Sequence, residues 1–370
     1  MSTRVVVIGA GVVGSALAAE LGRLGAGVTL IDSGRPAGGT SNATFSWTNA
    51  NSKEPREYHD LNVGGMLAHR RLAAELPAAS WYHAGGNLEW TDTAAGEAAL
   101  HAKVDRLRRY HYPVALLDRA QALTLEPSLA ADQLSDDGIA YYPEEGWIEP
   151  TRLVGTLLDL ARARGARVVT NDAVTGCTFD GAAVAGVTTA SGASFAADQV
   201  VDCAGPEAAA VAALAGLELP MRNTQGVLTY VEPVAVAVGR VIHGPRVQLR
   251  PDGGGRLLLH SEAADGAARQ RPDGGWDVAP GTAERLLADA AELYPAIDGA
   301  AVESVRVGTR PMPADGLPVL GRSAGIENFH FAVTHSAATL CLRIAELLGP
   351  EIVGGAASPE LAPFRHDRLG

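Results

Sequence analysis

Three glycines near the start of the chain have the spacing of a phosphate-binding turn. Gly9, Gly11 and Gly14 follow a short β-branched run, VVVI, and precede a small-residue-rich stretch with helical character. In this G-x-G-x-x-G spacing the first glycine permits a tight turn, the second lets the backbone approach a pyrophosphate, and the third lets the helix pack on the strand. The helix N-terminus favours a phosphate through its free amides and positive dipole. The pattern predicts a dinucleotide site formed by these glycines with Val12 and Val13.

An acidic residue is a second sign of dinucleotide binding. A second predicted strand, Val28–Ile31, ends in Asp32, near the spacing at which a carboxylate accepts hydrogen bonds from an adenosine ribose. An acid at this position argues against a 2′-phosphate, so NADP is not expected, whereas NAD and FAD are not distinguished. A glycine-rich turn can also join a strand to a helix without any ligand. The strand, helix, second strand and acid together favour a bound dinucleotide.

The composition is that of an ordinary globular protein with an acidic balance. Of 370 residues, 47% are hydrophobic and 19% are charged, and the net charge is −12. This charge disfavours nucleic acids and anionic membranes as partners. No uninterrupted apolar window reaches the roughly 18 residues of a membrane span, and the glycine-dense N-terminal run is not expected to be a signal peptide.

The cysteines give no sign of a metal site. Cys177, Cys203 and Cys341 lack metal-ligand spacing, and their odd number and apolar surroundings predict buried, reduced thiols. A cytoplasmic location is therefore expected.

The elements that must position the glycine turn alternate between strands and helices. Helices are expected over Tyr58–Leu76, Glu97–Arg109, Ala283–Leu293 and Ala337–Leu348, the last stopped by Gly349 and Pro350. A further helix is expected in the tract "IEPTRLVGTLLDLARARGARVVT", closed by Gly165 and leading to a strand. Strands are expected over Gln199–Cys203 and Phe329–Val333, a strand with a turn over Tyr82–Trp90, and a strand-rich region over Met221–Leu259. This order predicts an α/β protein with a discontinuous Rossmann-like nucleotide-binding domain (1–80, 146–215 and 305–370) and a β-rich α+β substrate domain (81–145 and 216–304).

Four tracts in the right order resemble one family. The tract Val307–Leu340, "VGTRPMPADGLPVLGRSAGIENFHFAVTHSAATL", the glycine turn, "GWIEPTRLVGTLLDLARARGARV" and "ADQVVDCAG" resemble the FAD-dependent amine and amino-acid oxidoreductases of the D-amino-acid oxidase superfamily, which includes glycine oxidase and sarcosine oxidase. The resemblance covers nearly the full length. It implies that the turn holds the ADP half of FAD. It also implies oxidation of a small amino acid or secondary amine, with hydride transfer from the α-carbon to flavin N5 and hydrolysis of the resulting imine.

The resemblance also implies which residues line the cofactor site. Ser33 and Arg35 would line the ADP site, Val174 would contact adenine, and Ala204, Gly205 and Gly308 would line the cofactor. The loop Gly38–Trp47 would pass the flavin with Thr40, Ser41, Asn42, Ala43 and Thr44, although its composition also suits a surface loop. The family's glycine-rich segment at the flavin pyrimidine edge is replaced here by Thr334–Thr339, in which His335, Ser336, Ala337, Ala338 and Thr339 would line the cofactor. The positive N-terminus of the helix that follows would stabilise negative charge on reduced flavin, and His335 is either a cofactor contact or a loop histidine.

By the same resemblance the flavin is expected to be non-covalent. Thr309 and Arg310 stand where some relatives tether flavin through cysteine, and Asn42 stands where others use histidine. Arg310 is predicted to be the catalytic-site residue that clamps a substrate carboxylate through its planar fork, the alternative being an ordinary ion pair.

Further residues are weaker candidates for the site, and other functions stay open. Lys53, Tyr58, His59, Tyr141, Tyr142 and His260 are the weaker candidates. Some oxidases place a lysine above the flavin to activate oxygen, whereas this chain offers His260, so the electron acceptor is oxygen or another molecule. A nicotinamide-dependent flavin hydroxylase and a flavin-binding protein without amine turnover are the alternatives, and the sequence does not select the oligomeric state.

Overall fold

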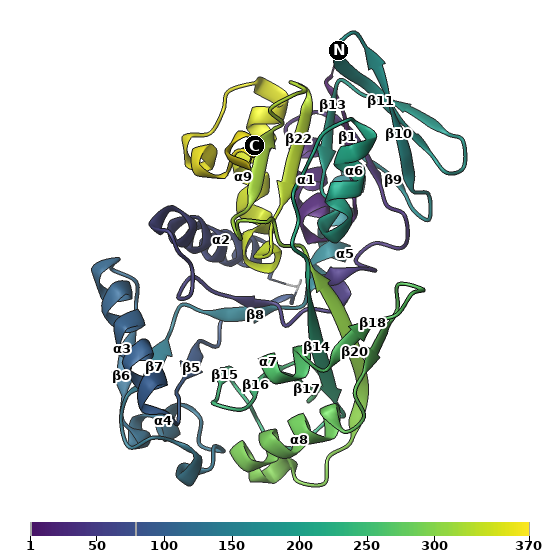
Figure 1. Cartoon of the computed structure of the whole chain (residues 1–370). Helices are drawn as coiled ribbons and strands as arrows, with labels where there is room; N and C mark the ends of the chain where they lie inside the picture. Colours follow the sequence, from purple (N-terminus) through teal and green to yellow (C-terminus); the bar gives the residue numbers. More distant parts are fainter. Residues whose placement is uncertain (1, 78–79, 370) are drawn as a thin grey trace.

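A six-stranded sheet forms the half of the molecule that carries both termini. The computed structural model describes residues 2–77 and 80–369. The strand order is β21-β22-β13-β1-β2-β9, and neighbours run parallel except for β21, which is antiparallel to β22 (Figure 1). The strands are β1 (Arg4–Ile8), β2 (Gly27–Ile31), β9 (Arg167–Val169), β13 (Gln199–Asp202), β21 (Val319–Arg322) and β22 (Phe329–Val333). The predicted α/β fold with a Rossmann-like sheet is confirmed.

The two faces of this sheet are covered by different elements. Val5 and Val7 of β1 pack with helices, whereas Val6 and Ile8 pack with a small antiparallel sheet and one helix. Successive strand side chains point to opposite faces, which explains why the whole apolar run is buried. The first face carries α1 (Val12–Arg23), α2 (Arg56–Glu75), α5 (Pro150–Ala163) and α9 (Ala337–Gly354). The second carries α6 (Ala208–Leu214), β10 (Val174–Asp180), β11 (Ala183–Thr189) and β12 (Ser194–Ala196).

An eight-stranded mixed sheet forms the other half, in the order β20-β14-β17-β16-β15-β5-β7-β6 (Figure 1). Leu286 and Leu293 of its covering helix α8 share a buried core with Val227 and Leu259 of the sheet. The strands are β5 (Asn87–Glu89), β6 (Ala115–Leu117), β7 (Ile139–Tyr142), β14 (Thr224–Val231), β15 (Val241–His243), β16 (Gln248–Pro251), β17 (Leu257–His260) and β20 (Val302–Arg310). The helices around it are α3 (Ala94–Arg109), α4 (Arg119–Leu125), α7 (Glu262–Asp265) and α8 (Thr282–Leu293).

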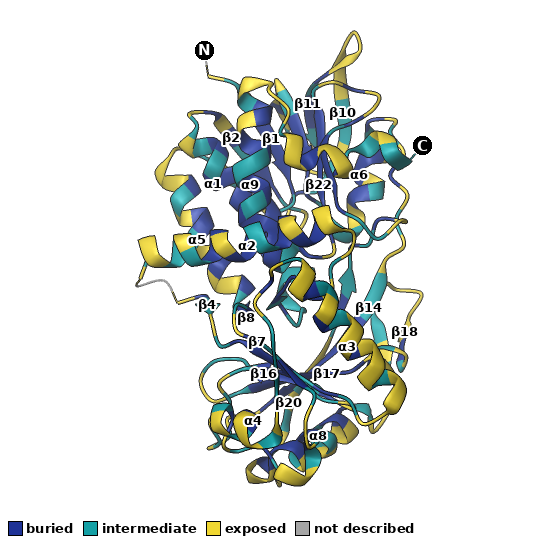
Figure 2. Ribbon diagram, turned by 90° about the vertical axis from the view of Figure 1, so that its left-hand side faces the viewer, coloured by how far each residue is buried: buried dark blue, intermediate teal, exposed yellow. Residues whose placement is uncertain are grey.

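Two small sheets complete the described fold. One contains β3 (Trp47–Thr48), β8 (Gly146–Ile148) and β4 (Tyr82–His83), and the other pairs β18 (Ala268–Gln270) with β19 (Trp276–Val278). Figure 2 shows buried residues concentrated in the large sheets and exposed residues along the outer side of α3. In the described part of the chain, no helix has the length and apolar character needed to cross a membrane.

The predicted end of the last helix is wrong. Helix α9 does not stop at Gly349 and Pro350 but continues to Gly354, and Gly355 follows with a φ of 78°. The last turn is held by tertiary contacts, because the buried Glu351 carboxylate pairs with Arg365 at 2.7 Å. This ion pair offsets the loss of one N–H at the proline, and the left-handed glycine then ends the helix.

Candidate functional site

The glycine turn joins β1 to α1 and has little room for side chains. Gly9 has a φ of 103°, and a Cβ atom there would lie 2.5 Å from Cys203 O. A Cβ atom on Gly14 would collide with Gly9 O. Backbone packing therefore requires glycine at both positions, the first for its left-handed turn and the second for close packing of the helix.

The middle glycine of the turn faces the loop that follows β2. Gly11 is the N-cap of α1, and a Cβ atom on it would lie 3.1 Å from Ser41 Oγ. Val12 N donates a hydrogen bond to the same Ser41 Oγ at 3.2 Å. The helix N-terminus therefore opens onto a polar loop.

Asp32 at the end of β2 is fixed by the turn. Its Oδ2 accepts a hydrogen bond from Ala10 N at 2.6 Å, and its Oδ1 accepts one from Gly34 N at 2.8 Å. The carboxylate is therefore held beside the glycine turn.

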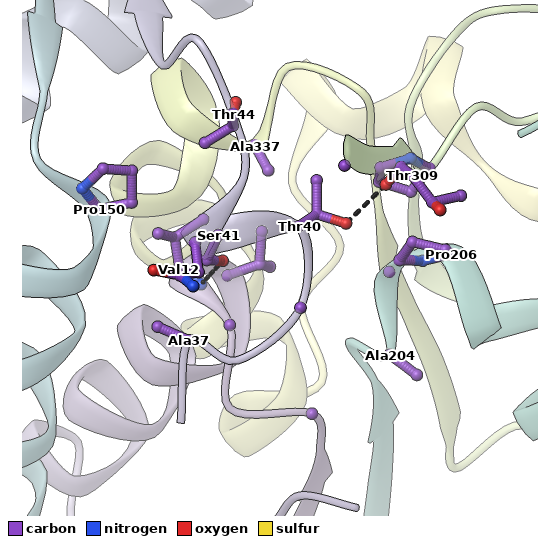
Figure 3. Close-up of a pocket in the computed structure, with 18 of the residues that line it drawn as sticks. Val12, Ala37, Thr40, Ser41, Thr44, Pro150, Ala204, Pro206, Thr309 and Ala337 are labelled. Carbon is purple, nitrogen blue, oxygen red and sulfur yellow. Dashed lines mark hydrogen bonds between the residues drawn. The ribbon is translucent and has the colours of Figure 1, made fainter. Parts of the chain in front are cut away.

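A cavity of about 540 Å³ starts at this turn and ends at the N-terminus of α9. Figure 3 shows the loop with Thr40, Ser41 and Thr44 crossing between Pro150 on one side and Pro206 and Thr309 on the other. The predicted residues that line the cavity are Gly9, Gly11, Val12, Val13, Asp32, Ser33, Thr40, Ser41, Asn42, Ala43, Thr44, Ala204, Gly205, Gly308, His335, Ala337 and Ala338. The structure thus gathers distant segments around one elongated space.

A second cavity, of about 460 Å³, extends the first beyond β2. Asp32, Ser33 and Ala204 line both, and Val174 lines the extension together with apolar residues of α6. The apolar walls and the carboxylate at the junction suit a purine ring and its ribose.

Gly14 and Arg35 were predicted to contact the cofactor, but they line neither of these cavities. Gly14 packs against Gly9 instead of facing the space, and Arg35 is exposed on the surface. Among residues that the sequence did not single out, Pro150, Pro206 and Arg306 line the first cavity. Arg306 could have been predicted from the sequence, because strand alternation places it on the same face of β20 as Gly308 and Arg310.

A third cavity, of about 350 Å³, lies on the other side of the loop and is called here the substrate-side cavity. It shares Thr40, Ala43, Thr44, Gly308, Pro311, His335 and Ala338 with the first cavity. Its other walls include Phe45, Trp47, Lys53, Gln248, His260, Asp265, Arg310, Ser336 and Thr339. The two spaces therefore meet around one set of residues.

Arg310 reaches this cavity, but its guanidinium is already engaged. Arg310 Nη2 lies 2.8 Å from Asp265 Oδ2 and 3.0 Å from His260 Nε2, and Nη1 donates to Gln225 O at 2.6 Å. Burial raises the pKa of Asp265, but the hydrogen bond from His260 and the charge of Arg310 outweigh it and lower the pKa overall. The sequence did not indicate this Asp265 partner.

His335 lies where the first and third cavities meet. It is among the residues that line both cavities. Burial within the protein, followed by the charges of Lys53 and Arg310, lowers the pKa of His335 to about 3. The imidazole is neutral at physiological pH.

Two further predicted residues hold the walls together. Ser336 Oγ is 2.6 Å from Tyr58 OH, and Thr339 Oγ1 accepts a hydrogen bond from Asn49 N at 3.2 Å. These hydroxyls tie the start of α9 to α2 and to the loop after β3.

The weaker candidates fall into two groups. Lys53 and His260 line the substrate-side cavity. Tyr58, His59, Tyr141 and Tyr142 do not line any of the three cavities. Tyr142 OH, for example, donates a part-buried hydrogen bond to Glu89 Oε2 at 2.9 Å.

Comparisons with known proteins agree with this geometry. Residues 4–349 match the DAO family, described as FAD dependent oxidoreductase. Glycine oxidase from Geobacillus kaustophilus is 28% identical over 97% of this chain and 95% of its own length. Human mitochondrial sarcosine dehydrogenase is 28% identical over 98% of this chain, which spans only 39% of that longer protein.

Solved structures show the same fold. The glycine oxidase from Geobacillus kaustophilus matches with a TM-score of 0.83 and 25% identity, covering 98% of both chains. The L-amino acid deaminase from Proteus vulgaris matches with a TM-score of 0.86 and 17% identity, covering 99% of this chain and 94% of that one. The protein is an enzyme with FAD as its cofactor, and the chain belongs to the DAO family of FAD-dependent oxidoreductases.

Proposed function

We propose that the enzyme oxidises a small amino acid or secondary amine by hydride transfer from the substrate α-carbon to flavin N5, giving an imine that hydrolyses. The observation that carries this proposal is the meeting of the cofactor cavity with the substrate-side cavity around shared residues such as Thr44, Gly308 and His335. Relatives named for glycine, sarcosine and iminodiacetate support the substrate class.

The residues present fit FAD. Gly9, Gly11 and Gly308 line the cofactor cavity, and Gly11 is the N-cap of α1, whose N-terminus favours a phosphate. Gly9, Gly11 and Asp32 would hold the ADP half, and the shared residues would hold the flavin half. When bound, FAD supplies the acceptor for the hydride, while the protein binds the amine, orients its α-carbon and excludes water.

We propose that attachment of the flavin is non-covalent. Asn42, at a tethering position of some relatives, has its backbone and side-chain oxygens within 3.3 Å of Arg306 Nη1, and neither Thr309 nor Arg310 is a tethering residue.

For the carboxylate of an amino-acid substrate we propose Arg310 as one contact. Asp265 and Gln225 occupy part of its fork, and a substrate would use the remaining N–H donors.

We also propose the division into a cofactor part (1–80, 146–215 and 305–370) and a substrate part (81–145 and 216–304). The strands of the six-stranded sheet all fall in the first part, while β20 straddles its boundary at residue 305. A cytoplasmic location is proposed because Cys177, Cys203 and Cys341 are all free thiols.

Product analysis tests the proposed reaction. The FAD-loaded enzyme is incubated with a panel of amino acids and secondary amines and an artificial dye acceptor. We expect one oxo acid or aldehyde for every two electrons that the dye accepts. Consumption of reduced nicotinamide with hydroxylation of an aromatic compound would instead indicate a flavin hydroxylase.

A further inference from the structure

The two cations of the substrate-side cavity have different partners. Arg310 is paired with Asp265 at 2.8 Å, and Asp265 Oδ1 is itself held by Val227 N at 2.7 Å. A fixed carboxylate at this distance compensates most of the guanidinium charge. Arg310 can therefore direct an anion through its free donors but adds little net positive charge.

Lys53 has no comparable partner. It lies between β3 and α2, lines the cavity, and its Nζ is 5.8 Å from the centre of the Tyr58 ring. Within residues 2–77 and 80–369, no side chain forms an ion pair with Lys53 and no atom accepts a hydrogen bond from its Nζ. The only other lysine in the sequence, Lys103, is paired with Glu89 at 2.6 Å.

The buried Glu145 is not an ion-pair partner of Lys53. Its charge favours the Lys53 ammonium, but both of its oxygens already accept hydrogen bonds from other groups. The donors are Trp47 Nε1 at 3.0 Å, Tyr112 OH at 3.0 Å, Asn51 N at 3.2 Å, Asn51 Nδ2 at 3.1 Å, Asn87 Nδ2 at 3.2 Å and Ala50 N at 3.4 Å. These bonds fix the loop two residues before Lys53.

The surroundings of Lys53 favour the binding of an anion to its ammonium group. Burial lowers its pKa to about 8, against the opposing effect of Glu145. The neutral His335 beside it brings no charge of its own. A carboxylate would relieve the cost of desolvation by a charge-assisted hydrogen bond.

We propose that the Lys53 ammonium binds the carboxylate of the substrate, so that the substrate is an amino acid and not an amine without an acid group. This rests on the proposed function. Lys53 supplies a cation that forms no ion pair with any described residue, and Arg310 directs the same carboxylate through its remaining donors.

Ligand binding tests this assignment without turnover. The FAD-loaded parent, Lys53→Met, Lys53→Arg and the control Lys103→Met are titrated with acetate and with its uncharged isostere acetamide, and the visible absorbance of the flavin is followed. Lys53→Met is expected to weaken acetate binding roughly 10-fold or more and to leave the affinity for acetamide unchanged. Lys53→Arg should keep most of the parent's affinity for acetate, and Lys103→Met should bind acetate as the parent does. Equal acetate affinity in Lys53→Met and the parent would overturn the proposal.

A second measurement uses the parent and does not depend on how the variants fold. Because the chain has two lysines, ¹⁵N-lysine labelling gives two side-chain signals. Acetate is expected to shift the Lys53 signal and raise its pKa while the Lys103 signal stays in place. A Lys53 signal that acetate does not move would contradict carboxylate binding.

Kinetics separate this proposal from two other outcomes. With an amino-acid substrate, Lys53→Met is expected to lower kcat/KM roughly 30-fold or more, mainly through KM, with a much smaller effect on the decarboxylated amine. If Lys53→Arg lost as much kcat as Lys53→Met, lysine would act as a base, and the proposal would be wrong. If no amine reduced the parent flavin, the proposed function would fail even though acetate binding still depended on Lys53.

Discussion

Single residues set the charge of the substrate-side cavity. Lys53 contributes an unpaired ammonium, whereas the Arg310 guanidinium is paired with Asp265 at 2.8 Å. His335 contributes no charge, because its pKa is lowered to about 3 by burial and by the two cations. Lys53 is therefore the cation of this cavity that has no ion-pair partner among the described residues, while Asp265 and Glu262 bring negative charge to the same lining.

Removal of Arg310 is expected to be costly for two reasons. Arg310→Leu removes donors for the carboxylate and leaves Asp265 unpaired and facing the cavity. Removal of one member of a buried charge pair typically costs about 2–5 kcal/mol of binding free energy. The kcat/KM for an amino acid should therefore fall roughly 30-fold to several thousandfold. Lysine at this position should rescue only part, because it lacks the planar fork. Steady-state kinetics with matched flavin content measure the loss.

A double variant separates the two reasons. Arg310→Leu combined with Asp265→Leu removes the unpaired carboxylate and should recover part of the loss. Full recovery to the parent kcat/KM would show that Arg310 only neutralises Asp265, and the predicted clamp would be wrong.

Substitution of Gly11 is expected to abolish FAD binding. A Cβ atom at Gly11 would lie 3.1 Å from Ser41 Oγ, and the extra methyl groups of valine would fill the space that the backbone offers to a pyrophosphate. Flavin content of purified Gly11→Val measures the effect. Gly155→Val is the control, because a Cβ atom at Gly155 meets nothing within 4 Å. Equal flavin content in Gly11→Val and the parent would refute the phosphate-site assignment.

At the scale of elements, strand β13 brings a buried acid to the edge of the cofactor cavity. Asp202 is fully buried, its Oδ1 accepts a hydrogen bond from Ala204 N at 2.9 Å, and its Oδ2 has no partner in the described residues. Burial raises its pKa to about 8 from a usual value of 3.8. The folded protein thus keeps a proton that the unfolded chain has lost.

This carboxyl group makes stability depend on pH. Between the two pKa values, 3.8 unfolded and about 8 folded, Asp202 contributes less stability as pH rises, by up to about 1.4 kcal/mol per pH unit. Asparagine at position 202 is uncharged at every pH. The Tm of Asp202→Asn minus the Tm of the parent should therefore increase from pH 5 to pH 8. The exposed Asp198→Asn, which loses an ion pair with Arg4, is the control and should show no such trend. Parallel Tm profiles for Asp202→Asn and the parent would contradict a protonated Asp202.

At the scale of the whole molecule, the cofactor is expected to leave when the fold is lost. Non-covalent FAD should appear in the supernatant after acid or heat denaturation of the yellow protein, and the precipitated polypeptide should be colourless. Absorbance of the two fractions measures this, and flavin that stays on the polypeptide would show a covalent link.

The sequence predicted what depends on local pattern. Gly9, Gly11 and Asp32 are recognisable because a strand, a turn and a helix N-terminus are encoded within one short segment. The Arg310–Asp265 pair was not predictable, because it joins the end of β20 to α7 and depends on how both pack on β14. The end of α9 was missed for a similar reason, since the Glu351–Arg365 pair holds the helix past Pro350. The exposed position of Arg35 likewise follows from the path of its loop and not from its neighbours in sequence.

Anaerobic reduction of the bound flavin tests the central claim most directly. The FAD-loaded enzyme is mixed without oxygen with glycine, sarcosine and other small amino acids, each also with deuterium at the α-carbon, and the visible flavin absorbance is followed in single turnover. We predict that at least one amino acid bleaches the flavin, that deuterium slows bleaching, and that the decarboxylated amine bleaches it far more slowly. Flavin that stays oxidised with every amino acid and amine, while still bound to the folded protein, would contradict the proposed oxidation of amino acids.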